Sequence, residues 1–221
     1  MNVHVLDALG ITLAVAAGAT ALVIVPGVAL GWLLARCAWR GKSVVETLVA
    51  LPLVLPPTAV GYLLLRLLGR HGPLGEGVLG VDLDLLFTRK GAVLAAAVMS
   101  LPLVARTARI AFEAVPARLE TMGASLGLSP ARVFASITLP LARRGLAAAA
   151  VLGFARALGE FGATVVVAGN IPGRTQTLAL AIFEDLQLGR DGSAMVLVGV
   201  SALLAFATIG CVEALSRERA R

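Results

Sequence analysis

The chain alternates between long apolar stretches and short segments rich in charge, glycine and proline. No charged residue lies between Asp7 and Arg36, and about 20 apolar residues are enough for a helix to cross a bilayer. Comparable apolar runs recur along the chain. We therefore predict an all-α integral membrane protein with one domain over residues 8–215 and five transmembrane helices, at residues 8–36, 44–68, 91–112, 145–168 and 194–215.

The basic residues predict how these helices are oriented. Arg36, Arg40 and Lys42 follow the first apolar run, and lysine and arginine are enriched in cytoplasmic loops. When the inner end of the third span from residue 106 is counted with the cytoplasmic segment, twelve of the 19 Lys and Arg residues fall inside, against six outside and Arg156 within the fourth span. We predict an outside N-terminus, an inside C-terminus and a cytoplasmic loop over residues 113–144.

The amino-acid composition is that of an integral membrane protein, which has membrane lipid as a partner. The chain is 58% hydrophobic and 14% charged, whereas soluble domains average about 25% charged residues. The formal charge of +6 therefore reflects basic residues in the loops beside the predicted spans, where they indicate which side of the membrane each loop is on. We predict no nucleic-acid partner. Cys37 and Cys211 end two spans on the predicted cytoplasmic side, where a disulfide is not expected.

Two of the predicted spans contain residues that are unusual in a membrane helix. Residues 51–57 read LPLVLPP, and prolines such as Pro56 and Pro57 bend or unwind a helix. Such a bend serves either packing or a pathway. Arg156 and Glu160 lie one turn apart in the fourth span, so they can pair on one face. They form either a structural ion pair or part of a polar path.

The loop between the third and fourth spans predicts two short helices. Residues 117–128 have an amphipathic pattern that ends at Gly127 or Leu128, and Ser129 and Pro130 are typical of the N-cap and first position of a new helix. We expect this second helix to end at Pro140. The pair would form either a connector on the membrane surface or a docking surface for a partner, with an apolar stripe of Val133, Phe134 and Ile137.

The remaining features are the external segments and two misleading motifs. Residues 69–90 form a glycine-rich acidic loop, and residues 169–193 contain a helical pattern too short to span. Residues 123–127 fit G-x-S-x-G, but the context is helical and His4 and His71 are external. Gly41-Lys42-Ser43 lacks the rest of a phosphate-binding loop, and no residue set has metal-ligand spacing. We predict no catalytic residue, metal or cofactor in this chain.

The cytoplasmic loop resembles the EAA loop of ABC-importer permeases, whose pattern is EAA-x3-G-x9-I-x-LP. Gly127 and Ile137-Thr138-Leu139-Pro140 match its second half, whereas Thr121-Met122-Gly123 stand at the EAA positions and Glu120 precedes them. In that family the loop inserts into the ATPase subunit. The resemblance implies an ATPase-coupling role for Glu120, Ala124, Gly127, Ser129, Pro130, Val133, Phe134, Ile137, Leu139 and Pro140.

Residues 51–65 and 157–183 are similar to the oxyanion branch of these permeases, and the run from Asn170 to Leu178 is most similar to the molybdate permeases. The resemblance implies a type I permease fold in the inner membrane, a homodimer, two ATPase subunits that bind ATP and Mg, and an external molybdate-binding protein. The implied translocation path or gate contains Pro56, Pro57, Arg156, Gly159, Glu160, Gly162, Thr164 and Asn170. Tungstate or sulfate are alternative cargoes, and an ATP-independent secondary anion transporter is the alternative class.

Overall fold

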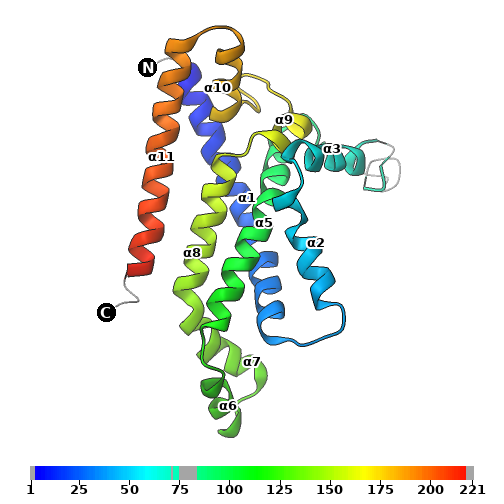
Figure 1. Cartoon of the computed structure of the whole chain (residues 1–221), viewed down its shortest axis with the longest axis vertical. Helices are drawn as coiled ribbons and strands as arrows, with labels where there is room; N and C mark the ends of the chain where they lie inside the picture. The colour runs from blue at the N-terminus through cyan, green and yellow to red at the C-terminus, as the bar shows by residue number, and fades with distance from the viewer. Residues whose placement is uncertain (1–2, 71, 75–83, 218–221) are drawn as a thin grey trace.

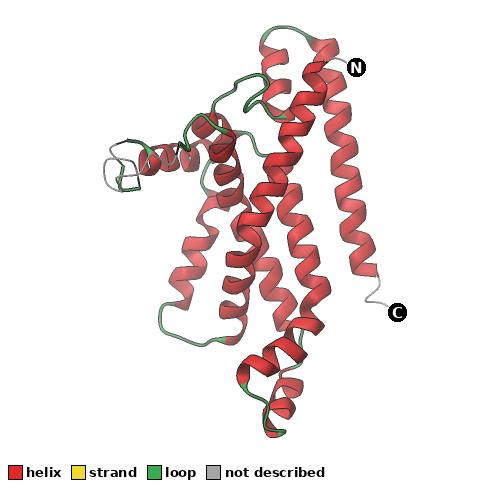
Figure 2. Cartoon of the chain, turned by 180° about the vertical axis from the view of Figure 1, so that it is seen from behind, coloured by secondary structure: helices red, strands yellow, loops and turns green. Residues whose placement is uncertain are grey.

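The computed structural model describes residues 3–70, 72–74 and 84–217, and every regular element in this part is helical (Figures 1 and 2). Residues 71 and 75–83 of the predicted acidic loop, which include His71, Glu76 and Asp82, lie outside the described residues, as do Arg219 and Arg221. The longer helices are α1 (Val3–Arg36), α2 (Lys42–Val54), α3 (Pro57–Leu68), α5 (Arg89–Glu113), α8 (Leu139–Leu158) and α11 (Asp191–Arg217).

The centre of the bundle is α5, which packs between α1 and α8. Its inward positions are mostly alanine, and Ala92, Ala96 and Ala108 have no exposed surface. Small side chains on facing helices let the helix axes approach closely. Gly153 of α8 is used in this way, because a Cβ on it would lie 2.5 Å from Cγ2 of Val104 on α5.

The second predicted span is broken at the proline pair. Helices α2 and α3 meet at an angle of 113° around Leu55 and Pro56, so α3 turns away from the direction of α2 (Figure 1). Pro57 is the first residue of α3, a position where its missing N–H and fixed φ are tolerated. With this bent pair counted as one span, the described residues contain five candidate spans by length and composition, and otherwise four.

The helix around Pro140 corrects one prediction. We expected the second loop helix to end at Pro140, but α7 (Pro130–Val133), η1 (Phe134–Thr138) and α8 form one helix over residues 130–158. The middle segment is a π-helix in which the Leu139 N–H donates to the carbonyl of Phe134, five residues back. This wider turn accommodates the donor that Pro140 lacks, so the helix continues.

The fourth predicted span is also interrupted. The structure ends α8 at Leu158 and starts a separate short helix, α9 (Gly162–Ala168), after a break at residues 159–161. The apolar pattern runs through this break, which is why the sequence alone predicted one continuous helix over residues 145–168. The predicted short surface helix is observed as α10 (Leu178–Gln187), at the same end of the molecule as the start of α1.

Candidate functional site

A pair of short helices protrudes from the end of the bundle opposite the N-terminus (Figure 1). It consists of α6 (Ala117–Ser125) and α7, which we call the coupling tip together with residues 126–129. Its outer surface is apolar at two positions that the sequence reading did not select, since Leu126 is 82% exposed and Met122 is 55% exposed. Four predicted coupling residues are exposed beside them, namely Ala124, Gly127, Ser129 and Pro130.

The turn between α6 and α7 depends on a glycine. Gly127 has a φ of +81°, the left-handed region that favours glycine, and it directly follows the α6 C-cap, Leu126. The N–H of Leu128 donates to the carbonyl of Gly123, and that of Gly127 to the carbonyl of Ala124, which is the Schellman arrangement. This cap ends α6 at Ser125, two or three residues earlier than the predicted end at Gly127 or Leu128.

Ser129 and Pro130 begin α7 as the sequence predicted. The Ser129 hydroxyl accepts a hydrogen bond from the Arg132 N–H at 3.4 Å, and Pro130 occupies the first turn. The coupling tip is therefore two helices joined by a turn whose glycine and serine are fixed by local geometry.

The apolar stripe of the second helix is partly covered by other residues of this chain. Val133 is buried, Ile137 is half-buried, and the ring of Phe134 lies 5.7 Å from that of Trp32 and 6.2 Å from that of Phe112. Phe134 attaches this helix to α1 and α5, whereas the side chains of Val133 and Ile137 lie next to Gly123 of α6. The docking role of this stripe stays a prediction, and Leu139 and Pro140 are exposed on the first turn of α8.

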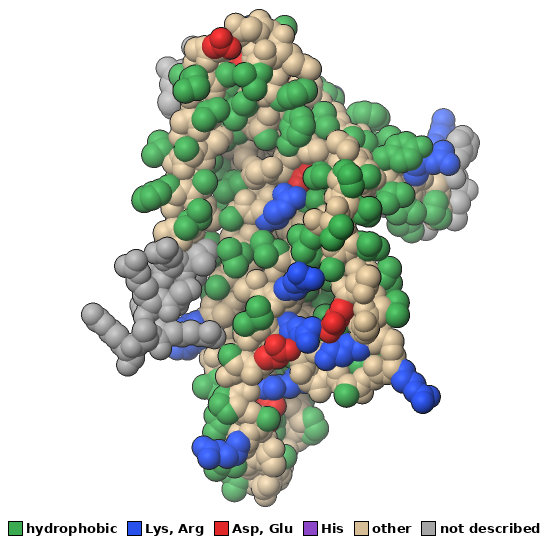
Figure 3. Space-filling model, viewed as in Figure 1, with side chains coloured by type: hydrophobic (Ala, Val, Ile, Leu, Met, Phe, Trp, Pro, Cys, Tyr) green, Lys and Arg blue, Asp and Glu red, His purple; other side chains and the backbone are tan. Residues whose placement is uncertain are grey.

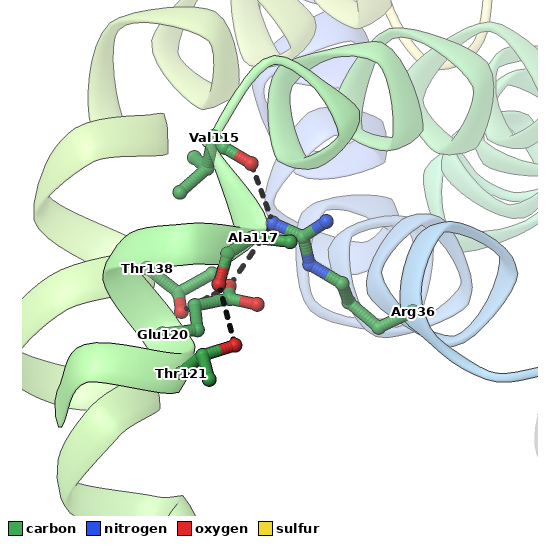
Figure 4. A network of polar contacts seen from close by, with 6 residues as sticks. All are labelled: Arg36, Val115, Ala117, Glu120, Thr121 and Thr138. Carbon is green, nitrogen blue, oxygen red and sulfur yellow. Dashed lines mark hydrogen bonds and ion pairs between the residues drawn. The ribbon is translucent and has the colours of Figure 1, made fainter. Parts of the chain in front are cut away.

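Glu120 lies at the centre of a polar network behind the coupling tip (Figure 4). Its Oε1 accepts from Nη2 of Arg36, the last residue of α1, at 3.0 Å, and from the hydroxyl of Thr138 in η1 at 2.7 Å. Arg36 also donates to the carbonyl of Val115 at 2.9 Å. Glu120 thus connects the coupling tip to two helices of the bundle, although it stands one position before the EAA site.

The second group of predicted residues lies at the break between α8 and α9. Nη1 of Arg156 is 2.8 Å from Oε2 of Glu160, whose side chain is only 2% exposed. The other carboxylate oxygen, Oε1, accepts from the N–H of Ala163 at 2.9 Å, near the start of α9. Both carboxylate oxygens are therefore occupied, one by a charge and one by a helix donor, which stabilises a buried carboxylate.

The two broken helices contact each other. A Cβ on Gly162 would lie 2.7 Å from Cβ of Pro57, and a Cβ on Gly61 would lie 2.9 Å from the Cα of Ala163. The α2–α3 break and the α8–α9 break thus form one contact between irregular segments, with Pro56 and Pro57 exposed beside it. Within the depth of a membrane, non-helical backbone is found only where it lines a cavity or is covered by protein.

Two predicted path residues, Asn170 and Gly159, lie outside this contact, and a third, Thr164, has a hydroxyl without a partner in the described part of the chain. Asn170 donates from Nδ2 to Oε2 of Glu184 on α10 at 2.7 Å, so it belongs to the external end. Gly159 lines a separate, mostly apolar cavity of about 400 Å³ with Thr12 and Leu178. Thr164 is buried on α9, and its hydroxyl has no hydrogen-bond partner among the described residues.

Sequence reasoning missed a second ion-pair network, on the inner half of α5. Nη1 of Arg109 lies 2.6 Å from Oε1 of Glu46 on α2, and its Nε lies 2.6 Å from Oε1 of Glu113. The i,i+4 spacing of Arg109 and Glu113 is visible in the sequence. The contact with Glu46 depends on how α2 packs against α5. Within the described ranges, no group of three or more His, Cys, Asp or Glu residues could hold a metal ion.

The arrangement of helices defines the class of protein. The chain superposes on a chain of the inward-facing MetNI methionine ABC transporter with a TM-score of 0.71 and 19% identity, covering 97% of this chain and 99% of that one. A chain of an amino acid ABC transporter crystallised with histidines gives a TM-score of 0.68 at 15% identity, covering 97% and 94%. The fold is that of the membrane subunits of type I ABC importers.

Sequence comparison gives the family. Residues 27–219 match the family described as "Binding-protein-dependent transport system inner membrane component", and the chain belongs to this family. It is 45% identical over 200 residues to the molybdenum transport system permease protein ModB of Escherichia coli (strain K12), covering 88% of this chain and 87% of that protein. ModB of Azotobacter vinelandii is 40% identical over 207 residues, covering 93% and 92%.

Proposed function

We propose that this chain is the membrane-spanning permease subunit of an ATP-driven importer that moves molybdate across the cytoplasmic membrane. The observation that supports the cargo is the 45% identity to a molybdenum transport permease over most of both chains. Tungstate and sulfate are related oxyanions and become outcomes of the test. Membership of the binding-protein-dependent family argues against an ATP-independent secondary carrier.

The partners follow from the role. Two copies of the chain would form a homodimer around a two-fold axis, because one bundle of this size hardly encloses a path. Cytoplasmic ATPase subunits would bind the coupling tips and carry ATP and Mg, and an external binding protein would deliver the anion at the end that carries α10. This chain itself would bind no cofactor and catalyse no reaction.

The contacts suggest how force from the ATPase reaches the path. A displacement of the coupling tip would act on α1 through the ion pair of Arg36 and Glu120. It would also act on α8, because α7, η1 and α8 are one helix from Pro130 to Leu158. The far end of that helix carries Arg156 and leads into the break at Glu160. Movement of the tip would therefore change the contact between the two broken helices.

Uptake of labelled molybdate tests this proposal directly. Proteoliposomes would carry this subunit, its ATPase and the external binding protein, with unlabelled sulfate or tungstate as competitors. We expect uptake that requires ATP, persists in excess sulfate and is competed by tungstate, which has a similar size and charge. Uptake abolished by sulfate would assign sulfate as the cargo. Uptake without ATP would overturn the proposed class.

A further inference from the structure

Arg106 differs from Arg109 on the same helix and from Arg156 on α8. Its side chain is exposed on the inner half of α5, and within the described part of the chain it has no carboxylate at ion-pair distance. Arg109 contacts two carboxylates, and Arg156 contacts Glu160. The positive charges of these two arginines are therefore compensated, whereas that of Arg106 is not.

The three arginines lie at successive depths. Gly153 on α8 packs against Val104 on α5, and the two helices run in opposite directions along this contact. At 1.5 Å per residue, Arg156 lies about 4.5 Å from the contact toward the outside, and Arg106 lies about 3 Å toward the cytoplasm. Arg109 is about 4.5 Å further inward. Figure 3 shows basic side chains following one another down this face over α8 and α5.

The depth of Arg106 makes a lipid environment costly. Arg106 follows Arg89, the first residue of α5, by 17 positions, which is about 25 Å along a helix, and the hydrocarbon core is about 30 Å thick. An uncompensated arginine inside that core costs at least about 2.5 kcal/mol. Exposed charges at such a depth usually face a water-filled path or the interior of an assembly. Arg109, Arg156 and their carboxylate partners make the surroundings of Arg106 polar as well.

We infer that Arg106 is an anion-binding station on the inner half of the translocation path, where it holds a divalent tetrahedral oxyanion. This inference rests on the proposed function and on the proposed homodimer. A guanidinium donates two parallel hydrogen bonds to a pair of oxyanion oxygens, so it fits this cargo well. Two copies of Arg106 facing each other across the two-fold axis would match the charge of one dianion.

The compensated arginines have a different role in this scheme. Arg156 already donates to Glu160, and Arg109 already donates to Glu46 and Glu113. These negative charges would weaken a direct contact of Arg156 or Arg109 with an anion. They keep the face polar and fix the helices on either side. At Arg106, in contrast, an incoming anion would meet a charge that no carboxylate of the described residues compensates.

The test compares Arg106→Gln and Arg106→Lys with the wild-type complex, using Arg66→Gln as the matched control, because Arg66 is exposed on α3 away from α5 and α8. The measurements are ATP-dependent molybdate uptake, co-purification of the ATPase and the melting temperature. We expect Arg106→Gln to lower uptake by about 10-fold or more, the effect of losing a charged hydrogen bond. Arg106→Lys should retain part of the rate, and Arg66→Gln should transport normally.

A second variant separates loss of charge from loss of folding. Arg106→Cys, in a chain where Cys37 and Cys211 are alanine, would be modified with a methanethiosulfonate reagent that adds either an ammonium or a sulfonate. Recovery of uptake with the ammonium reagent alone supports the inference. Uptake by Arg106→Gln within about twofold of the wild type, or equal recovery with both reagents, overturns it. Absence of uptake by the wild-type complex would instead refute the proposed function.

Discussion

Arg36 and Glu120 lie 84 positions apart in the sequence, and their Nη2 and Oε1 atoms are 3.0 Å apart in the structure. The pair joins the end of the first membrane helix to the first helix of the coupling tip. Both side chains are about one fifth exposed, so water screens the interaction only partly. This contact gives the coupling tip a defined position relative to the bundle.

Breaking this ion pair should uncouple ATP hydrolysis from transport. We expect Glu120→Ala to lower the number of molybdate ions carried per ATP, because α6 then loses its contacts with both Arg36 and Thr138. The stability cost should be about 1 kcal/mol. The measurement is uptake and hydrolysis in the same proteoliposomes. Exchanging the charges in Arg36→Glu with Glu120→Arg should recover more coupling than either single change, and equal behaviour of all three would contradict the role.

The outer surface of the coupling tip should bind the ATPase through its exposed leucine. Leu126 is 82% exposed, so Leu126→Ser removes little contact within this chain and should leave the melting temperature nearly unchanged. We expect it to reduce the amount of ATPase that co-purifies. Leu188→Ser is the matched control, since Leu188 is 54% exposed and follows α10 at the other end of the molecule. A similar loss of ATPase in both variants would show that the effect is not local.

The turn at Gly127 should tolerate asparagine better than alanine. A Cβ at this position would meet no atom within 4 Å, so the cost of a side chain comes from the φ of +81° alone. That cost is about 1–2 kcal/mol for alanine, and asparagine adopts this region more readily. We expect ATPase co-purification to fall in the order glycine, asparagine, alanine. Gly199→Ala on α11, also unobstructed but without a positive φ, should behave as the wild type.

The charge of Glu160 should matter more than its hydrogen bond to α9. In Glu160→Gln the amide oxygen can still accept from Ala163, but Arg156 loses its counter-charge. Breaking fully buried pairs costs about 3–5 kcal/mol, and Arg156 is 27% exposed, so we expect about 1–3 kcal/mol. Thermal unfolding measures this. Arg156→Gln combined with Glu160→Gln should recover stability without recovering uptake. Normal uptake in both single variants would remove these residues from the gate.

The contact between the two broken helices should not accept added volume. In Gly162→Ala the new methyl group would lie 2.7 Å from Cβ of Pro57, so α3 and α9 must separate. Overpacking of this kind costs about 1–3 kcal/mol. We expect a lower melting temperature and slower uptake. Gly192→Ala, where the methyl group meets nothing within 4 Å, is the control, and equal effects of the two changes would argue against a tight contact.

The amino-acid sequence by itself determined the class of fold and the local ends of several helices. Long uncharged apolar runs require helices in a membrane, because backbone donors and acceptors must be paired within the segment there. The start of α7 at Ser129 and Pro130 and the turn at Gly127 depend on residues close to them in the chain, so their chemistry was readable in advance. The family motif around residues 127–140 has the same local origin.

Only the tertiary structure decided which side chains meet and which way each face points. The partners of Glu120 and Arg109 lie 84 and 63 positions away, and no local pattern encodes such distances. Val133, Phe134 and Ile137 are apolar whether they face a partner or the bundle, and only the structure shows Phe134 against Trp32 and Phe112 and the other two beside Gly123. The helix that continues through Pro140 and the break after Leu158 have the same cause, since apolar runs record burial and not the continuity of backbone hydrogen bonds.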